Sequence, residues 1–260
     1  MSFKELSINE LINHEFDCSC GKKHIASIEN IAIGKNALDK LPGIMETQKL
    51  KDGSILSKSD KVFIVADVNT WEVAGERVES MVVQAGYPVE KYIFPHKSMH
   101  AEDKYAEEMK EHLPADTKLI IAIGSGSLND LTRYVAFGAG LPYYIVATAP
   151  SMDGYASNVS PLVHNNLKIT YSAECANAII GDTDILATAP DVMIAAGLGD
   201  VLGKYLAIND WKMSELINGE YYCPEVGELV LYSVKKCVDT VPGLVNRESD
   251  ALQYLMESLV

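Results

Sequence analysis

The chain has 260 residues, of which 48% are hydrophobic and 22% are charged, and its formal net charge is −14. This length suffices for one large domain or two ordinary ones, and the composition is that of a globular protein. The excess of acidic residues argues against nucleic acid or an anionic membrane as a partner. The negative charge does not exclude phosphate ligands, because backbone N–H groups at helix N-termini bind phosphate locally.

Targeting signals and membrane spans are missing from the sequence. No apolar run approaches the roughly 20 residues of a membrane helix. The first residues, MSFKELSINELINHEF, lack the apolar core of a secretory signal. We therefore expect a cytoplasmic protein without membrane insertion.

The five cysteines, at positions 18, 20, 175, 223 and 237, form no disulfide pattern. Cys18, Cys20 and His24 lie in the segment CSCGKKH, which resembles half of a zinc site. A closed tetrahedral site needs a second pair of ligands, and none follows nearby. A polar turn with reduced thiols is the favoured interpretation, and a structural zinc site is the alternative.

Strands and helices alternate over the first 187 residues. Apolar runs predict strands over 28–33, 61–66, 92–94, 119–123 and 143–147, and another strand that begins at 178–181 and finishes at 182–186. Helical spacing predicts helices that begin at 37–41, where Pro42 interrupts, and that span 71–85, 101–113 and 128–137. Residues 162–171 predict a hairpin around Asn165 and Asn166. The alternation predicts an α/β fold with a mostly parallel, doubly wound sheet.

The pattern changes after residue 187. Helical patterns over 198–216 and 225–238 follow without intervening strands. We therefore predict an α/β domain over 1–187 and the start of an all-helical domain over 188–260. The sequence stops inside a helical pattern, so we expect a truncated chain.

The segment 148–161, TAPSMDGYASNVSP, follows the apolar run 141–147. In open α/β sheets the ligand crevice lies beyond the carboxyl ends of the strands. Small hydroxyls and one carboxylate, Asp153, at such an end indicate a ligand-binding loop. The alternative is a solvated loop rich in turn-forming residues.

Two further motifs follow strands. Residues 124–130, GSGSLND, join a buried strand to a helix, where two glycines let backbone approach a pyrophosphate. An ordinary turn with Asp130 as a favourable first-turn charge is the alternative. Asp67 ends an earlier strand, where an acid either accepts hydrogen bonds from a ribose or forms a turn.

Asp200 lies in the segment AGLGDVLGK, which we expect to form the first turn of a helix. There it either stabilises the helix or serves as a metal ligand or substrate anchor. Lys204 follows one turn later, and a surface ion pair with Asp200 is favoured over contact with an anionic substrate.

Taken together, SMDGYAS, GSGSLND and GLGDVLGKYLAINDW resemble the sn-glycerol-1-phosphate dehydrogenase family, within the superfamily of iron-containing alcohol dehydrogenases and dehydroquinate synthase-like enzymes. CSCGKKH is similar to the bacterial branch. The resemblance implies a dinucleotide-binding domain and a helical metal and substrate domain. It also implies NAD(H)- or NADP(H)-dependent reduction of dihydroxyacetone phosphate, a homodimer, and a product destined for phospholipid synthesis.

The resemblance also implies roles for individual residues. The cofactor pyrophosphate is held by Gly126, Ser127, Leu128, Asn129 and Asp130, and the adenosine ribose by Asp67. The rest of the cofactor is contacted by Thr148, Ala149, Pro150, Ser151 and Ser157. Asp153 and Asp200 are the catalytic, substrate-binding residues, and Asp200 is the metal ligand.

The family binds Ni²⁺ or Zn²⁺, and its other two ligands are histidines further along the chain. Here all six histidines (14, 24, 96, 100, 112 and 164) precede Asp200, a departure from the family pattern that also favours truncation. The alternatives are a glycerol dehydrogenase-like or dehydroquinate synthase-like enzyme, or a catalytically inactive nucleotide-binding fragment.

Overall fold

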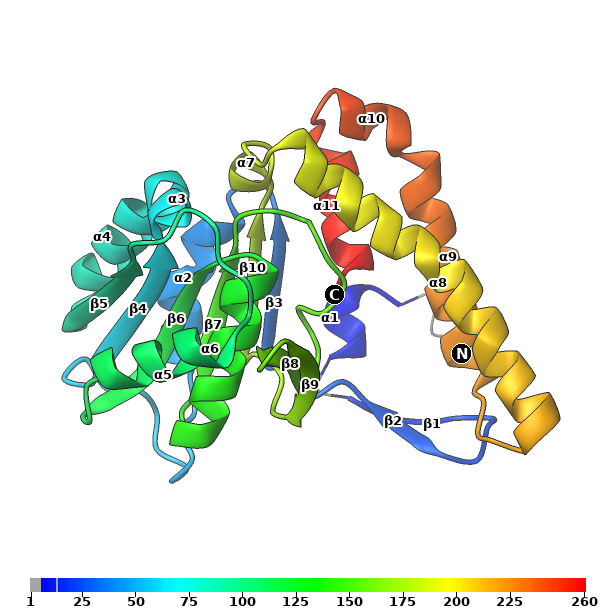
Figure 1. Ribbon diagram of the computed structural model, residues 1–260, viewed down its shortest axis with the longest axis horizontal. Coiled ribbons are helices and arrows are strands. Elements are labelled where there is room, and N and C mark those ends of the chain that lie inside the picture. Colours follow the sequence, from blue (N-terminus) through cyan, green and yellow to red (C-terminus); the bar gives the residue numbers. More distant parts are fainter. Residues whose placement is uncertain (1–5, 13) are drawn as a thin grey trace.

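The computed structural model describes residues 6–12 and 14–260. Its centre is a sheet of β3 (Asn30–Gly34), β4 (Lys61–Asp67), β5 (Val89–Phe94), β6 (Thr117–Gly124), β7 (Tyr143–Ala147) and β10 (Ala178–Asp182). All neighbouring strands are parallel, in the order β3-β10-β7-β6-β4-β5. The predicted α/β fold with a parallel, doubly wound sheet is confirmed (Figure 1).

Helices cover both faces of this sheet because successive strand residues point to opposite sides. Phe63, Ile120 and Ile145 face α5 (Asp103–His112), α6 (Gly126–Ala139) and α11 (Ser249–Ser258). Ile64 and Ile121 face η2 (Ala37–Lys40), α2 (Leu41–Glu46) and α4 (Glu76–Gln84) on the other side. The strands read as continuous apolar runs because both faces are buried.

Two predicted helices differ in detail from the helices in the structure. Pro42 lies in the first turn of α2 and does not interrupt it, because a helix's first N–H groups need no partner. The helix predicted over 71–85 begins earlier, with α3 (Val68–Thr70) and the π-helix η3 (Trp71–Gly75) before α4. The helical spacing over 71–85 places Val73 on one apolar stripe with Ala74 and Val78, but Val73 is 42% exposed. The wider π turn shifts the phase of the stripe there.

Beyond the sheet the chain is helical, with α7 (Thr183–Leu186), α8 (Asp191–Asn218), α9 (Pro224–Asp239), α10 (Val241–Val245) and α11. Residues 183–186, expected to finish a strand, form α7 because the Asp182 carboxylate accepts the Asp184 N–H at 3.1 Å and caps the helix. The last helix, α11, packs back on the sheet beside β3. The division at residues 187 and 188 stays a prediction.

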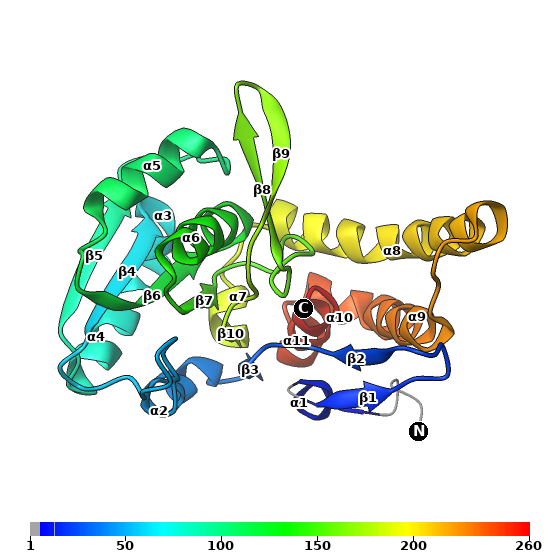
Figure 2. The ribbon, with the colours of Figure 1, turned by 90° about the horizontal axis from the view of Figure 1, so that it is seen from below.

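Two hairpins stand outside the sheet. β8 (Val159–His164) and β9 (Leu167–Ser172) form the predicted hairpin, with φ values of 48° at Asn165 and 62° at Asn166. Near the N-terminus, α1 (Ile8–Leu11) precedes the hairpin of β1 (Glu15–Asp17) and β2 (Lys23–Ile25). Figures 1 and 2 both show this hairpin beside α9, away from the sheet.

None of the helices among the described residues combines the length and the apolar character that a bilayer crossing requires.

Candidate functional site

The candidate site lies at the carboxyl ends of β4, β6 and β7. Because the strands are parallel and in register, Asp67 and Gly124 come out at the same edge of the sheet, as does Ala147 beside Gly124. The chain runs outward from β4 to β5 and then returns to β6 on the other side of β4. Ligands bind where the strand order reverses in this way. The crevice is therefore expected between Asp67 and Gly124.

Two glycines allow neighbouring side chains to approach the backbone closely where α6 begins. A Cβ atom on Gly124 would lie 2.5 Å from Leu128 Cδ1, and one on Gly126 would lie 2.9 Å from Met152 Cγ. No side chain caps the helix at Ser125. The first N–H groups of a helix lack intrahelical partners and carry partial positive charge, which suits a phosphate. This geometry supports the predicted role of Gly126, Ser127 and Leu128, which stays a prediction.

The side chain of Asn129 holds the 148–161 loop directly, and that of Asp130 acts through Arg133. Asn129 Nδ2 donates to the Gly154 carbonyl at 3.3 Å, and Asn129 N–H is bonded to Ser125 O at 2.9 Å. Asp130 Oδ1 accepts from Arg133 Nη1 at 2.7 Å. Their predicted contacts with the pyrophosphate stay a prediction, but both side chains are already engaged within the chain.

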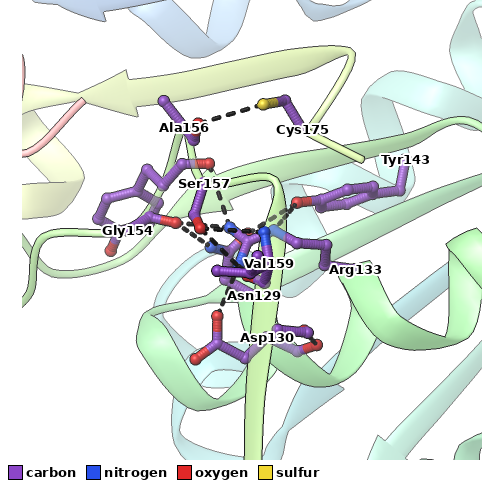
Figure 3. Close-up of polar contacts among 11 residues, drawn as sticks. Asn129, Asp130, Arg133, Tyr143, Gly154, Ala156, Ser157, Val159 and Cys175 are labelled. Carbon is purple, nitrogen blue, oxygen red and sulfur yellow. Dashed lines mark hydrogen bonds and ion pairs between the residues drawn. The ribbon is translucent and has the colours of Figure 1, made fainter. Parts of the chain in front are cut away.

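Arg133 is the central anchor of the loop, and sequence reasoning missed it (Figure 3). Its side chain is buried, 1% exposed. It donates to three loop carbonyls, those of Gly154 (2.5 Å), Tyr155 (3.3 Å) and Val159 (2.9 Å). Nε donates to Tyr143 Oη at 3.0 Å. The signal in the sequence was its i,i+3 spacing from Asp130 on a helix facing the loop.

Burial dominates the electrostatics of Asp130. It raises the pKa of this carboxyl to about 6, against the opposing effect of the Arg133 guanidinium. The carboxyl of Asp130 therefore titrates just below neutral pH.

Other contacts fix the start of the loop. Thr148 N–H donates to Gly124 O at 3.0 Å, which ties the loop to the turn before α6. The buried Tyr155 hydroxyl donates to Ala149 O at 2.6 Å. Ser157 Oγ donates to Val159 O at 3.1 Å, so this hydroxyl closes a local turn. Ala149 and Pro150 are buried, whereas Ser151 is half-buried. Their predicted cofactor contacts stay a prediction.

Helix α8 packs directly against the 148–161 loop. A Cβ atom at Gly197 would lie 1.9 Å from the Pro150 carbonyl oxygen, so only glycine allows this approach. One turn later, Asp200 Oδ2 accepts the Asp153 N–H at 3.0 Å. Because α8 begins at Asp191, Asp200 lies in the helix interior, and its expected position in a first turn is wrong. Gly197 marks a close contact between the helix and the loop instead of a helix start.

Lys204 completes a small charged group. Its Nζ lies 3.2 Å from Asp153 Oδ2 and donates to Ser258 O at 2.7 Å. The favoured pairing with Asp200 is therefore wrong, because the loop brings Asp153 within reach of the lysine. A cavity of about 250 Å³ lies beside this group, lined by Asp153, Gly154, Ala156, Ser157 and Val260. This arrangement offers two carboxylates and one cation to a small polar substrate.

Asp67 ends β4 and caps the helix that follows. Its Oδ1 accepts the N–H groups of Asn69 and Thr70, each at 2.8 Å. The turn-forming role is thus present, and the predicted hydrogen bond to a ribose stays a prediction.

A catalytic metal normally has about three protein ligands. Among the described residues, the cluster of three or more His, Cys, Asp or Glu ligands is Cys18, Cys20, His24 and Cys223, and Asp200 is not part of it. The described residues around Asp200 therefore do not fit a metal site, and its predicted role as a Ni²⁺ or Zn²⁺ ligand stays a prediction.

A family model described as iron-containing alcohol dehydrogenase matches residues 32–190. The chain belongs to the iron-containing alcohol dehydrogenase family. The chain is also similar to proteins named glycerol-1-phosphate dehydrogenase [NAD(P)+]. That of Bacillus licheniformis is 32% identical over 94% of this chain and 59% of its own length. That of Bacillus velezensis is 33% identical over 96% and 62%. The chain thus spans about three fifths of the length of the curated relatives it matches.

Solved structures of this family have the same fold. The glycerol dehydrogenase of Schizosaccharomyces pombe matches with a TM-score of 0.70 at 20% identity, covering 90% of this chain and 59% of that one. The NADH-dependent butanol dehydrogenase A of Thermotoga maritima matches with a TM-score of 0.69 at 14% identity, covering 96% and 62%. At these identities the likeness concerns the fold alone.

Proposed function

We propose that this chain takes part in the NAD(P)H-dependent reduction of dihydroxyacetone phosphate to sn-glycerol 1-phosphate. The observation that carries the proposal is the meeting of the α6 N-terminus with the loop that holds Asp153, at the point where the strand order reverses. The identity of about 30% to glycerol-1-phosphate dehydrogenases over most of the chain supports it.

The residues of the site form two groups, one proposed to bind the cofactor and one proposed to bind the substrate. The N–H groups that begin α6 would hold the cofactor pyrophosphate, and Asp67 would accept hydrogen bonds from the adenosine ribose. Asp153, Asp200 and Lys204 would bind and orient the triose on the α8 side. Bound in this crevice, the reduced nicotinamide supplies the hydride that reduces the ketone.

The family's metal enters the proposal with Asp200 as one ligand, Ni²⁺ or Zn²⁺ being the ions expected. Among the described residues, Asp200 belongs to no group of three possible metal ligands. Asp200 itself positions Asp153, because its carboxylate accepts a hydrogen bond from the Asp153 backbone N–H.

The proposal includes a cytoplasmic homodimer, following the resemblance to the family. None of the five cysteines forms a disulfide, which suits a reducing compartment. Sedimentation velocity measures the oligomeric state, and a monomer at micromolar concentration would remove the dimer from the proposal.

NADH oxidation tests the proposed activity. Purified protein is assayed with dihydroxyacetone phosphate and with dihydroxyacetone, and the chirality of the product is determined. We expect turnover with the phosphorylated triose and sn-glycerol 1-phosphate as product. Turnover with dihydroxyacetone alone would identify a glycerol dehydrogenase-like enzyme. NADH binding without turnover of either substrate would identify a nucleotide-binding module.

Asp67 governs the proposed cofactor preference. A carboxylate beside the 2′-hydroxyl of the ribose repels the extra phosphate of NADPH. We therefore expect a higher kcat/KM with NADH than with NADPH. In Asp67→Asn the ratio should move toward NADPH, and an unchanged ratio would show that Asp67 does no more than cap its helix.

A further inference from the structure

Four metal-binding side chains meet at the tip of the N-terminal hairpin, although the sequence separates them widely. Cys18 and Cys20 lie in the turn between β1 and β2, His24 lies in β2, and Cys223 directly precedes α9. The four ligand atoms all lie within 4.8 Å of one another. The apparent half-site CSCGKKH therefore has a fourth ligand, which lies about 200 residues further along the chain.

Three of the six separations between the ligand atoms are close to those of a tetrahedral zinc centre. With Zn–S of ~2.3 Å and Zn–N of ~2.0 Å, a tetrahedron has S···S edges of about 3.8 Å and S···N edges of about 3.6 Å. Cys18 Sγ lies 3.6 Å from Cys223 Sγ. His24 Nε2 lies 3.3 Å from Cys20 Sγ and 3.4 Å from Cys223 Sγ. The thiol separation far exceeds the ~2.05 Å of a disulfide.

The surroundings of the cluster suit a metal held only by protein. Cys223 is buried and the other three ligands are half-buried, which limits access of water. Tyr221 Oη lies 3.2 Å from Cys20 Sγ, where its hydroxyl can donate to a thiolate. The Lys22 ammonium lies over the Tyr221 ring, 3.6 Å from its centroid. This cation offsets the net negative charge of three thiolates around Zn²⁺.

The β1–β2 hairpin also has little burial of its own to stabilise it. β1 and β2 have three residues each, and none of these six residues is buried. An isolated two-stranded hairpin is marginally stable at best in water. A metal that joins its turn to the connection between α8 and α9 would supply the missing stability, as metals do in small domains.

We propose that Cys18, Cys20, His24 and Cys223 bind one structural Zn²⁺ that fastens the N-terminal hairpin to the α8–α9 connection. Soft thiolate and imidazole ligands favour Zn²⁺ over Mg²⁺ or Ca²⁺. All four tetrahedral positions are filled by protein, so no position is left open for substrate. Asp200 lies 18 residues before the end of α8, or ~27 Å along the helix axis. The proposal does not depend on the proposed dehydrogenase activity.

Metal content of the untagged protein tests the proposal. We expect about one zinc per wild-type chain after dialysis, with Zn–S distances of ~2.3 Å by X-ray absorption. Cys20→Ser and Cys223→Ser should lose this zinc. Loss of a group that only hydrogen-bonds a ligand weakens metal affinity roughly 10- to 100-fold, so loss of a ligand should exceed that. Cys175→Ser is the matched control, because this thiol lies outside the cluster, and Asp200→Ala separates the cluster from any metal at the substrate side.

A second measurement serves if a cysteine variant fails to fold. Cobalt added to chelator-treated wild-type protein should give the intense visible bands and thiolate charge-transfer bands of a tetrahedral site. Amide exchange in the hairpin and in residues 219–224 should slow when metal is restored, while exchange in the sheet stays the same. A wild-type chain without zinc and without these cobalt bands would overturn the proposal. So would zinc retained by Cys223→Ser, or a disulfide between Cys18 and Cys223 found by mass spectrometry.

Discussion

At the scale of single residues, the helix after the glycine turn has two tasks. Its first N–H groups are suited to phosphate, whereas Asn129, Asp130 and Arg133 hold the loop that carries Asp153. Because the same helix does both, the position of the loop is fixed relative to the proposed cofactor crevice. The loop is therefore preorganised by buried hydrogen bonds.

Arg133→Met should destabilise the protein strongly. The substitution removes the hydrogen bonds from Arg133 to the carbonyls of Gly154, Tyr155 and Val159. It also leaves the partly buried Asp130 carboxylate without its cation. Breaking a buried pair in this way costs about 3–5 kcal/mol. Urea unfolding measures the change, with Arg133→Lys as a control that keeps the charge and loses part of the hydrogen bonding. A change in Arg133→Met below about 1 kcal/mol would contradict the anchoring role.

Stability should depend on pH through Asp130. Its pKa is raised from 3.8 to about 6 in the folded chain, mainly by burial. The stability contributed by protonation is thus fully present below pH 3.8 and is lost as pH rises through about 6. Between pH 7 and pH 5 the wild type should gain stability relative to Asp130→Asn, which does not titrate. Urea unfolding at both pH values checks this, and a relative loss at pH 5 would refute it.

At the scale of elements, the packing of α8 on the loop depends on Gly197. Gly197→Ala places a Cβ atom 1.9 Å from the Pro150 carbonyl oxygen, so helix and loop must separate. Overpacking of this kind costs about 1–3 kcal/mol. At Gly199 and Gly203 a Cβ atom meets nothing within 4 Å, so alanine there should stabilise α8 by up to about 1 kcal/mol. Thermal unfolding of the three variants compares them, and equal effects would contradict the close contact.

The elements that the sequence predicted best are the buried strands. β4, β6 and β7 are continuous apolar runs that end in turn-forming residues, so their boundaries fall within two residues of expectation. The helix predicted from residue 198 begins earlier, because Gly197 and Gly199 lie inside α8. The role of Gly197 depends on a partner, the Pro150 carbonyl, that local sequence does not reveal.

The order of strands and polar turns in the sequence predicts which edge of the sheet carries the candidate site. Asp67, Gly126 and Asp153 follow strands that end at this edge, and their ligand-binding roles stay predictions. Arg133 was missed because a charged residue on a helix is usually solvated, and its burial depends on carbonyls of a distant loop. Cys223 was missed as a partner of Cys20 for the same reason, since tertiary contact alone joins them.

At the scale of the whole molecule, the site joins the sheet to the long helix α8. Asp200→Ala removes the acceptor of the Asp153 N–H without touching α6. We expect kcat/KM for dihydroxyacetone phosphate to fall roughly 100-fold, as misplacement of a substrate-binding group by about 1 Å does. Asp210→Ala, on the exposed part of the same helix, is the matched control and should leave kcat/KM unchanged. Similar losses in both variants would mean that the effect comes from α8 itself.

We propose that the dinucleotide binds in the crevice between the carboxyl ends of β4 and β6. Titration of NADH by fluorescence tests it with two valine variants of α6. Gly126→Val puts a Cβ atom 2.9 Å from Met152 and covers the first N–H groups, whereas Gly138→Val lies in open space on the same helix. Lost hydrogen bonds to a charged group are worth about 1.5–3 kcal/mol, or roughly 10- to 100-fold in Kd. We expect that loss for Gly126→Val alone, with Gly138→Val and Asp200→Ala binding NADH like the wild type. Wild-type affinity in Gly126→Val would overturn the proposed binding site.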